Sequence, residues 1–207
     1  MSNLSRRLVM AAAAAGAALA LASCNQAGSA GGASADAMTM GDPKAPVHVE
    51  EYASLTCGHC GQFALEVLPA FKAKYIDTGK VRYTLHEFPT PPIAVAAAGF
   101  LTARCAGKDK YFGVVDAIFH SQQEMFTSGD PRGVLLKVAQ SAGMTEQQFN
   151  ACIQDEKALE ALNARVEQSA RRQNISSTPT FVVNGKVVKE GAMTLEELDA
   201  AIAAASK

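Results

Sequence analysis

The sequence lacks the features that mark several common classes of protein. Its 207 residues carry a net charge of −1 with no block of lysine and arginine interleaved with aromatic residues, so a nucleic-acid-binding surface is not expected. No internal repeat is apparent. An apolar run from Leu8 to Leu21 has fourteen residues, fewer than the ~20 that a membrane-spanning helix needs. With 48% hydrophobic and 19% charged residues, the rest of the chain is suited to one globular domain.

The N-terminal segment has the layout of a secretory signal. Arg6 and Arg7 precede the apolar run, and small residues and a cysteine follow it. The end of this segment, Leu21-Ala22-Ser23-Cys24, resembles the bacterial lipobox, in which the signal is removed and the cysteine sulfur is acylated. We therefore predict a signal over residues 1–23 and a lipid anchor at Cys24. Ordinary signal cleavage nearby, with Cys24 incidental, is the alternative.

Residues 25–41 contain almost no large apolar side chains, so they cannot bury enough surface to offset the entropy of ordering. We predict a flexible linker over residues 24–44 and a folded domain over residues 45–207. A linker of about 17 such residues has a root-mean-square reach of roughly 20 to 25 Å. The domain would thus stay close to a membrane that held Cys24.

The first part of the domain changes from strand to helix and back to strand. Residues 47–52 alternate between apolar and polar side chains, which predicts a strand. Apolar residues at helical spacing predict a helix over residues 61–76, with a kink at Pro69. A second strand is expected over residues 80–88. The segment TCGHCG at 56–61 therefore lies where a strand passes into a helix.

The rest of the domain is predicted to be helical first and then β again. Residues 93–173 show no strand pattern and contain helix-start signals at Asp130-Pro131 and at Thr145, so four or five helices are expected. Further on, Asn184-Gly185 between two short apolar segments predicts a hairpin with a type I′ turn. A capping box that begins at Thr194 predicts a last helix.

The five cysteines limit what the pair Cys57 and Cys60 can be. A zinc site needs four ligands, and the chain has no second Cys-x-x-Cys motif. Covalent haem attachment needs histidine directly after the second cysteine, where this sequence has Gly61. Copper(I) suits a thiol pair near histidines, but the methionines do not cluster with this pair. A permanent disulfide would close too small a ring to stabilise the fold much, so a redox couple explains the spacing best.

The start of a helix favours ionisation of Cys57, because its sulfur meets unpaired N–H groups and the positive end of the helix dipole. Lowering a cysteine pKa from ~8.5 to ~5 takes about 5 kcal/mol. The dipole supplies only ~0.3 to 2 kcal/mol, so other donors must contribute. We expect the imidazole of His59 to lie against the Cys57 sulfur. An exposed loop histidine is the alternative.

Cys105 and Cys152 both fall inside the predicted helical region. If Cys24 is acylated and Cys57 pairs with Cys60, these two remain for each other, which is plausible in an exported chain. Two buried free thiols are the alternative.

Three stretches resemble the DsbA-like group of thioredoxin-fold disulfide oxidoreductases. They are EEYASLTCGHCGQF at 50–63, the helical insertion over about 92–173, and STPTFVVNGK at 177–186. The resemblance covers about residues 45–205 and implies an α/β thioredoxin fold with an inserted helical subdomain. The dipeptide between the cysteines differs from the Pro-His of the best-known members and matches the Gly-His of eukaryotic disulfide isomerase domains, which leaves the redox potential open.

The resemblance also implies roles for residues outside the cysteine pair. The bond Thr178-Pro179 corresponds to the family's cis-proline loop and would pack beside Cys57 and Cys60. Thr178 would offer its backbone to an extended substrate segment. Glu51 matches the position of a buried acid that could relay the proton of Cys60, with an exposed strand carboxylate as the alternative.

We therefore expect a thiol:disulfide oxidoreductase on the periplasmic side of a bacterial membrane, lipid-anchored or otherwise soluble in the periplasm. It would pass the Cys57–Cys60 disulfide to folding proteins that contain cysteine, and it would need no cofactor or metal. Reoxidation by a DsbB-like membrane oxidase is implied by the resemblance alone. A reductase or isomerase of the same fold and a copper-binding lipoprotein are the alternatives.

Overall fold

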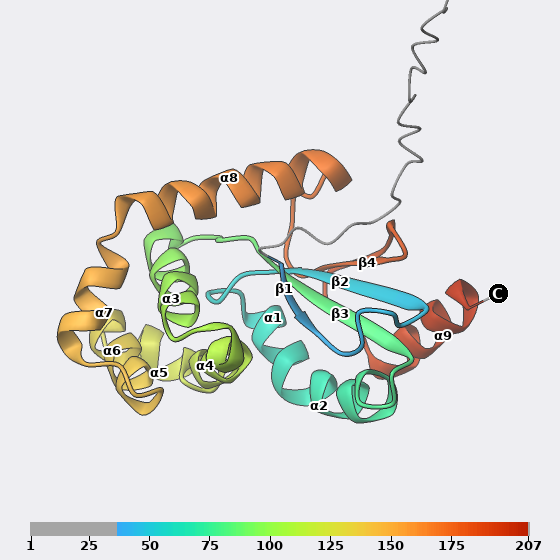
Figure 1. The fold of residues 1–207 in the computed structure, drawn as a ribbon, viewed down its shortest axis with the longest axis horizontal. Helices are drawn as coiled ribbons and strands as arrows, with labels where there is room; N and C mark the ends of the chain where they lie inside the picture. Colours follow the sequence, from blue (N-terminus) through green and yellow to red (C-terminus); the bar gives the residue numbers. More distant parts are fainter. Residues whose placement is uncertain (1–36, 207) are drawn as a thin grey trace, which may run out of the picture. The chain divides into compact units, whose positions relative to one another are not determined.

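The structure, a computed structural model, describes residues 37–206 (Figure 1). The predicted signal, Cys24 and the linker up to residue 36 lie outside the described residues. Within residues 37–206, no helix combines the length and the apolar character that crossing a bilayer requires.

A five-stranded mixed sheet forms the centre of the fold, in the order β1-β3-β2-β4-β5. The parallel neighbours β2 (Val47–Ala53) and β3 (Val81–Glu87) are the strands predicted from alternation. The other three strands, β1 (Met38–Met40), β4 (Thr180–Val183) and β5 (Lys186–Glu190), run antiparallel to their neighbours.

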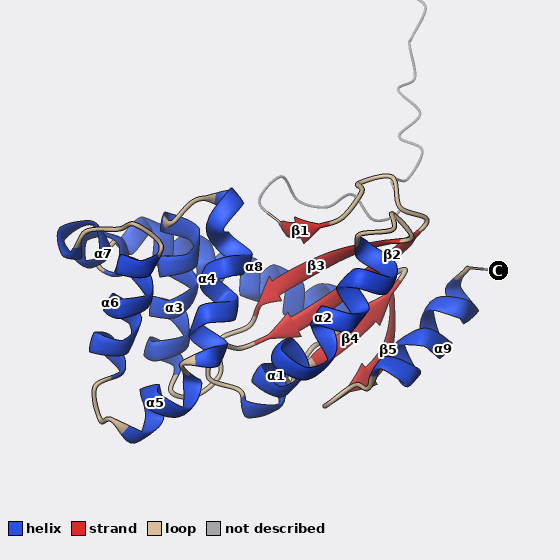
Figure 2. Cartoon of the chain, turned by 90° about the horizontal axis from the view of Figure 1, so that it is seen from below, coloured by secondary structure: helices blue, strands red, loops and turns tan. Residues whose placement is uncertain are grey.

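The predicted helix after β2 begins at Gly58, three residues earlier than expected, and runs to Ile76 as four consecutive segments. These are α1 (Gly58–Gln62), the π-helical η1 (Phe63–Val67), α2 (Leu68–Phe71) and the π-helical η2 (Lys72–Ile76). The irregularity lies beside Pro69, as predicted, because proline has no N–H to donate to the preceding turn. This helix covers one face of the sheet (Figure 2).

Six helices lie between β3 and β4, so the expected number of four or five was too low. They are α3 (Ile93–Cys105), α4 (Lys108–His120), α5 (Gln122–Thr127), α6 (Pro131–Ser141), α7 (Glu146–Ile153) and α8 (Glu156–Gln173). Only Ser121, with φ −90° and ψ 2°, interrupts the chain between α4 and α5, and so short a break has no clear sequence signal. The C-terminal part of α8 lies on the face of the sheet opposite α1 and α2 (Figures 1 and 2).

The local signals for helix starts and for the hairpin are confirmed. The side chain of Asp130 accepts a hydrogen bond from the Gly133 N–H, and Thr145 and Thr194 form complete capping boxes. Thr194 begins α9 (Leu195–Ala205). Between β4 and β5, Asn184 and Gly185 have φ values of 46° and 79°, which a type I′ turn requires.

The linker prediction was wrong for residues 38–40. These residues form β1, which pairs with β3, and the Met38 side chain is only 5% exposed. Thr39 also shares a hydroxyl hydrogen bond with Thr84 at 2.9 Å. A three-residue strand among small residues has too little periodicity to be recognised from sequence. It is ordered by its partner strand rather than by its own composition.

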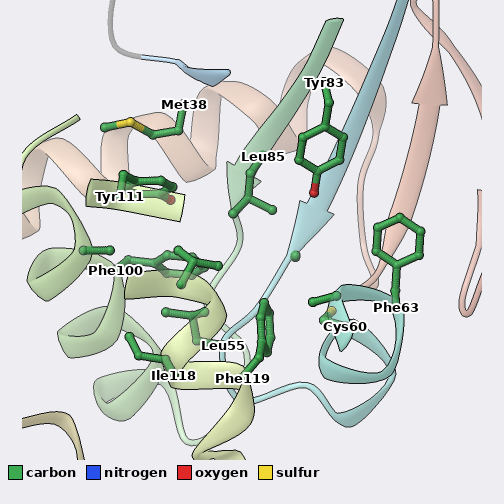
Figure 3. Close-up of a cluster of buried hydrophobic side chains, with 14 of the residues drawn as sticks. Met38, Leu55, Cys60, Phe63, Tyr83, Leu85, Phe100, Tyr111, Ile118 and Phe119 are labelled. Carbon is green, nitrogen blue, oxygen red and sulfur yellow. The ribbon is translucent and has the colours of Figure 1, made fainter. Parts of the chain in front are cut away.

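The sheet and the inserted helices share one hydrophobic core. Figure 3 shows this cluster. Its labelled members come from the sheet, from the active-site helix and the loop before it, and from the insertion: Met38, Leu55, Cys60, Phe63, Tyr83, Leu85, Phe100, Tyr111, Ile118 and Phe119. Cys60 belongs to this core, so one sulfur of the predicted redox pair is buried in the same cluster as side chains of the insertion.

Candidate active site

Cys57 lies at the N-terminus of the helix that follows β2. Its backbone is extended, with φ −88° and ψ 121°, and no side chain caps the helix start. The Cys57 side chain is partly buried, whereas Cys60, one helical turn later, is completely buried. Both are free thiols in the structure. One sulfur is therefore accessible to a second molecule and the other is not.

Hydroxyl groups hold the loop that leads to Cys57. The Thr56 hydroxyl donates to the Thr90 carbonyl at 2.8 Å, and the Ser54 hydroxyl accepts from the Thr90 N–H at 3.0 Å. Ser54 and Thr56 also bond to each other at 2.9 Å. Ser54 and Thr56 are buried and Thr90 is partly buried, so water competes little for these hydrogen bonds. The loop thus has a defined geometry before the helix begins.

The surroundings of Cys57 lower its pKa to about 5. The largest cause is a hydrogen bond from the Cys60 thiol to the Cys57 thiolate, and burial acts against it. Further hydrogen bonds from the Thr178 side chain and from the backbone N–H groups of Cys60 and His59 also stabilise the thiolate. Several hydrogen-bond donors therefore stabilise the Cys57 thiolate together, since the helix dipole alone is too weak to lower the pKa this far.

His59 contributes differently from the sequence-based expectation. Its side chain is exposed, and its contribution to the Cys57 thiolate comes from the backbone N–H. The predicted contact between the imidazole and the sulfur is replaced by a main-chain donor that any non-proline residue would supply.

Glu51 lies in β2, two strand residues before the end of the strand, and is only 2% exposed. The Tyr83 hydroxyl from β3 donates to the Glu51 carboxylate. Burial raises the pKa of Glu51 to about 8, against the effect of the Tyr83 hydrogen bond, and the negative charge of Cys57 raises it further. Burial likewise raises the pKa of Cys60 well above its usual range. Cys60 therefore keeps its proton at neutral pH beside a carboxyl group that titrates near neutrality.

Thr178 and Pro179 lie next to Cys57, and the bond between them is cis. The Cys57 thiol donates to the Thr178 carbonyl at 3.4 Å, across 121 residues of sequence. Pro179 is buried and directly precedes β4, which pairs with β2. The sheet thus brings the Thr178-Pro179 loop to the cysteine pair.

The other cysteines lie in the insertion. A disulfide joins Cys105, at the end of α3, to Cys152 in α7, with an S–S distance of 2.00 Å. Cys105 is exposed and Cys152 is buried.

Two contacts of the site had no signal in the sequence. Tyr83 was placed in a strand with no role, and Gln122 was not singled out, although its amide donates to the carbonyls of Leu55 and Cys57. A buried aromatic at an alternating position is ordinary strand sequence. Within residues 37–206, no group of three or more His, Cys, Asp or Glu side chains is arranged to hold a metal ion.

A family model described as "Thioredoxin" matches residues 33–204 of the chain. The chain belongs to the thioredoxin family. The match includes the six-helix insertion as well as the sheet, so the inserted helices are part of this family's fold rather than a separate domain.

Among curated relatives, a Rickettsia typhi protein named "Putative protein-disulfide oxidoreductase" is 34% identical over 149 residues, which are 72% of this chain and 54% of the relative. The corresponding Rickettsia conorii protein is 31% identical over 166 residues, 80% of this chain and 58% of the relative. The chain thus spans a little more than half the length of these relatives.

Solved structures show the same architecture. The crystal structure of alpha-DsbA1 from Wolbachia pipientis has a TM-score of 0.74 and 27% identity, and the match covers 84% of this chain and 92% of that chain. BdbD from Bacillus subtilis has a TM-score of 0.69 and 21% identity, covering 82% and 92%. The fold is therefore the DsbA-like thioredoxin fold with a helical insertion, as the resemblance implied.

Proposed function

We propose that this protein is an exported thiol:disulfide oxidoreductase that donates a Cys57–Cys60 disulfide to folding proteins. The observation that carries the proposal is the unequal environment of the two sulfurs. Cys57 is accessible and has a lowered pKa, and Cys60 is buried and has a raised pKa. The family and the name of the Rickettsia relative agree with this chemistry.

The first step forms a mixed disulfide. A substrate thiolate attacks the Cys57 sulfur, the Cys57–Cys60 bond breaks, and Cys60 takes the electron pair. A buried thiolate is costly, so Cys60 must gain a proton as the bond breaks. Glu51 is buried on the adjacent strand with a pKa of about 8. It can supply that proton below this pH and accept it in the reverse reaction.

The second step releases the oxidised substrate. A second substrate thiolate attacks the substrate sulfur of the mixed disulfide, and Cys57 leaves as a thiolate. The substrate has then lost two electrons and the protein has gained two. Because Cys57 is a stabilised leaving group, reduction of the protein is favoured, and each ~1.4 kcal/mol of stabilisation raises the potential by about 30 mV. This favours the oxidising direction.

Thr178 is proposed to position the substrate. Its carbonyl lies 3.4 Å from the Cys57 sulfur, and it is only partly buried. An extended substrate segment can pair with the main chain at this point, which tolerates many substrate sequences. The cis bond before Pro179 shapes the loop.

The setting is proposed from the N-terminal sequence. A signal over residues 1–23 would export the chain, and acylation of Cys24 would hold it at the periplasmic side of the membrane. Cysteine-containing proteins that fold there would be the substrates. A DsbB-like membrane oxidase would restore the Cys57–Cys60 disulfide.

The equilibrium with reduced and oxidised glutathione tests the direction, together with oxidation of a reduced, unfolded test protein. We expect a potential well above the thioredoxin value of about −270 mV and stoichiometric disulfide transfer. Cys57→Ser should abolish transfer. Cys60→Ser should also abolish transfer to the test protein, because no Cys57–Cys60 disulfide can form. With oxidised glutathione it should accumulate a mixed disulfide between Cys57 and glutathione, since no Cys60 thiol is present to resolve it.

Other outcomes would support other functions. A potential near that of thioredoxin would indicate a reductase, and reshuffling of incorrect disulfides by the reduced form would indicate an isomerase. Tight stoichiometric copper binding that requires both cysteines, without any disulfide transfer, would contradict the proposal and favour copper delivery.

A further inference from the structure

A side chain of the helical insertion hydrogen-bonds to the active-site loop. Gln122 is the first residue of α5, and its Nε2 donates to the carbonyl of Leu55 at 3.0 Å and to that of Cys57 at 3.1 Å. These partners lie 67 and 65 residues earlier in the chain. One amide group thus bridges both ends of the segment that enters α1.

The Cys57 carbonyl is held from two sides. It accepts the Gly61 N–H at 3.0 Å, the first intrahelical bond of the active-site helix, and the Gln122 amide at 3.1 Å. A carbonyl has two lone pairs, so the two bonds complete its capacity. The orientation of the Cys57 backbone relative to the helix is therefore determined by an internal contact and by one from the insertion.

Gly61 makes room for this contact. A Cβ at this position would lie 2.7 Å from Gln122 Oε1 and 3.5 Å from Phe119 Cδ1. A side chain here would displace the amide, so the glycine after Cys60 and the glutamine fit each other. Met125 in the same short helix is only 2% exposed, which anchors α5 in the core.

The donors that lower the pKa of Cys57 belong to the helix start whose first carbonyl Gln122 contacts. The backbone N–H groups of His59 and Cys60 and the Cys60 thiol all donate to the Cys57 sulfur. Hydrogen bonds weaken steeply with misalignment. Cys57 is the N-cap residue, yet its helix start has no side-chain cap that could hold it in place.

We propose that Gln122 is a positioning residue for disulfide exchange, which fixes the Leu55–Cys57 segment so that the Cys57 sulfur stays aligned with the donors of α1. This role rests on the proposed function. It gives the insertion a part in the reactivity of the sulfur, in addition to its part in the core. The residue acts through the backbone and does not contact the reacting atoms.

The test is the pH dependence of Cys57 alkylation in the full chain, with Gln122→Met and Gln123→Met as a matched pair. Gln123 is the exposed neighbour on the same helix. Methionine keeps the length of the side chain and removes the amide. We expect Gln122→Met to raise the alkylation midpoint and to lower the thiolate fraction below that midpoint by about 2- to 10-fold, the range for one or two neutral hydrogen bonds. The equilibrium with glutathione should shift toward the oxidised protein by the same factor.

Gly61→Ala provides a second route if Gln122→Met fails to fold. It leaves Gln122 in place and displaces its amide, so the midpoint should shift in the same direction. Equal midpoints for the Gln122→Met, Gln123→Met and unaltered proteins, or no shift in Gly61→Ala, would overturn the positioning role. That outcome differs from failure of the proposed function, in which Cys57 of the unaltered protein would itself titrate like a free cysteine.

Discussion

At the scale of single residues, the proposed proton transfer at Cys60 depends on Glu51 and on its buried partner Tyr83, which the sequence did not reveal. Tyr83 donates to Glu51, and both side chains are almost completely buried. The hydrogen bond stabilises the carboxylate and so opposes the rise in the Glu51 pKa that burial causes. The tyrosine keeps this pKa close to neutrality, where a carboxyl group can both give and take a proton.

Tyr83→Phe should raise the pKa of Glu51 further above about 8. The pH at which Glu51 begins to accept the Cys60 proton should then rise, by up to about one unit for the loss of one hydrogen bond. The measurement is the pH profile for oxidation of the reduced protein by oxidised glutathione. Tyr111→Phe is the control, because it removes an equally buried hydroxyl that bonds to Glu87 instead. Identical profiles for the two variants would remove Tyr83 from the mechanism.

A second prediction concerns His59. Alanine keeps the backbone N–H through which His59 stabilises the Cys57 thiolate, and the imidazole is exposed. His59→Ala should therefore move the alkylation midpoint of Cys57 by less than about 0.3 units, a few tenths of a kcal/mol. A rise of one unit or more in this midpoint would instead support the direct contact between the His59 imidazole and the Cys57 sulfur that the sequence suggested.

At the scale of elements, the insertion has its own cross-link. The disulfide between Cys105 and Cys152 ties the end of α3 to α7 across 47 residues of sequence. A disulfide that closes a loop of this length lowers the entropy of the unfolded chain. On the chain-entropy model this stabilises the fold by about 4 kcal/mol.

Replacing both of these cysteines by alanine should lower the free energy of unfolding by ~2 to 4 kcal/mol. Denaturant unfolding with Cys57 and Cys60 kept in one redox state measures this. The alkylation midpoint of Cys57 serves as the internal control and should stay unchanged. A stable double variant with an altered midpoint would mean that the disulfide acts on the redox pair rather than on stability.

At the scale of the whole molecule, the lowered pKa of Cys57 links redox state to stability. A thiolate exists only in the reduced form, and its folded pKa of about 5 lies below the ~8.5 of an unfolded cysteine. A lowered folded pKa stabilises the fold fully above the unfolded pKa, and this contribution is lost as the pH falls through the folded pKa. Glu51 is present in both redox forms, but the Cys57 charge that raises its pKa exists only in the reduced form, so Glu51 opposes part of this gain.

The stability of the reduced form relative to the oxidised form should therefore rise between pH 5 and about pH 8.5. Above that pH the raised pKa of Cys60 opposes a further gain. Denaturant unfolding of both forms at several pH values tests this. A difference in stability that stays constant from pH 4.5 to 8 would contradict the assigned thiolate. Cys57→Ser and its parent, both with reduced sulfurs, provide the control.

The sequence by itself determined the elements that depend on neighbours along the chain. Alternation predicted β2 and β3, capping boxes predicted the starts of α7 and α9, and Asn184-Gly185 predicted the hairpin. The Cys-x-x-Cys pair was placed correctly at the junction of a strand and a helix. These features result from local hydrogen bonding and side-chain periodicity, which depend only on residues close together in the sequence.

Only the tertiary structure decided which groups surround the two sulfurs. The contacts Tyr83 to Glu51, Gln122 to Cys57 and Cys57 to Thr178 join residues 32, 65 and 121 positions apart. The family resemblance had implied only the last of them. The burial that raises the pKa values of Cys60 and Glu51 likewise comes from the packing of the sheet, the active-site helix and the insertion into one core. No local pattern encodes such contacts, because the free energy that forms them comes from packing the whole domain.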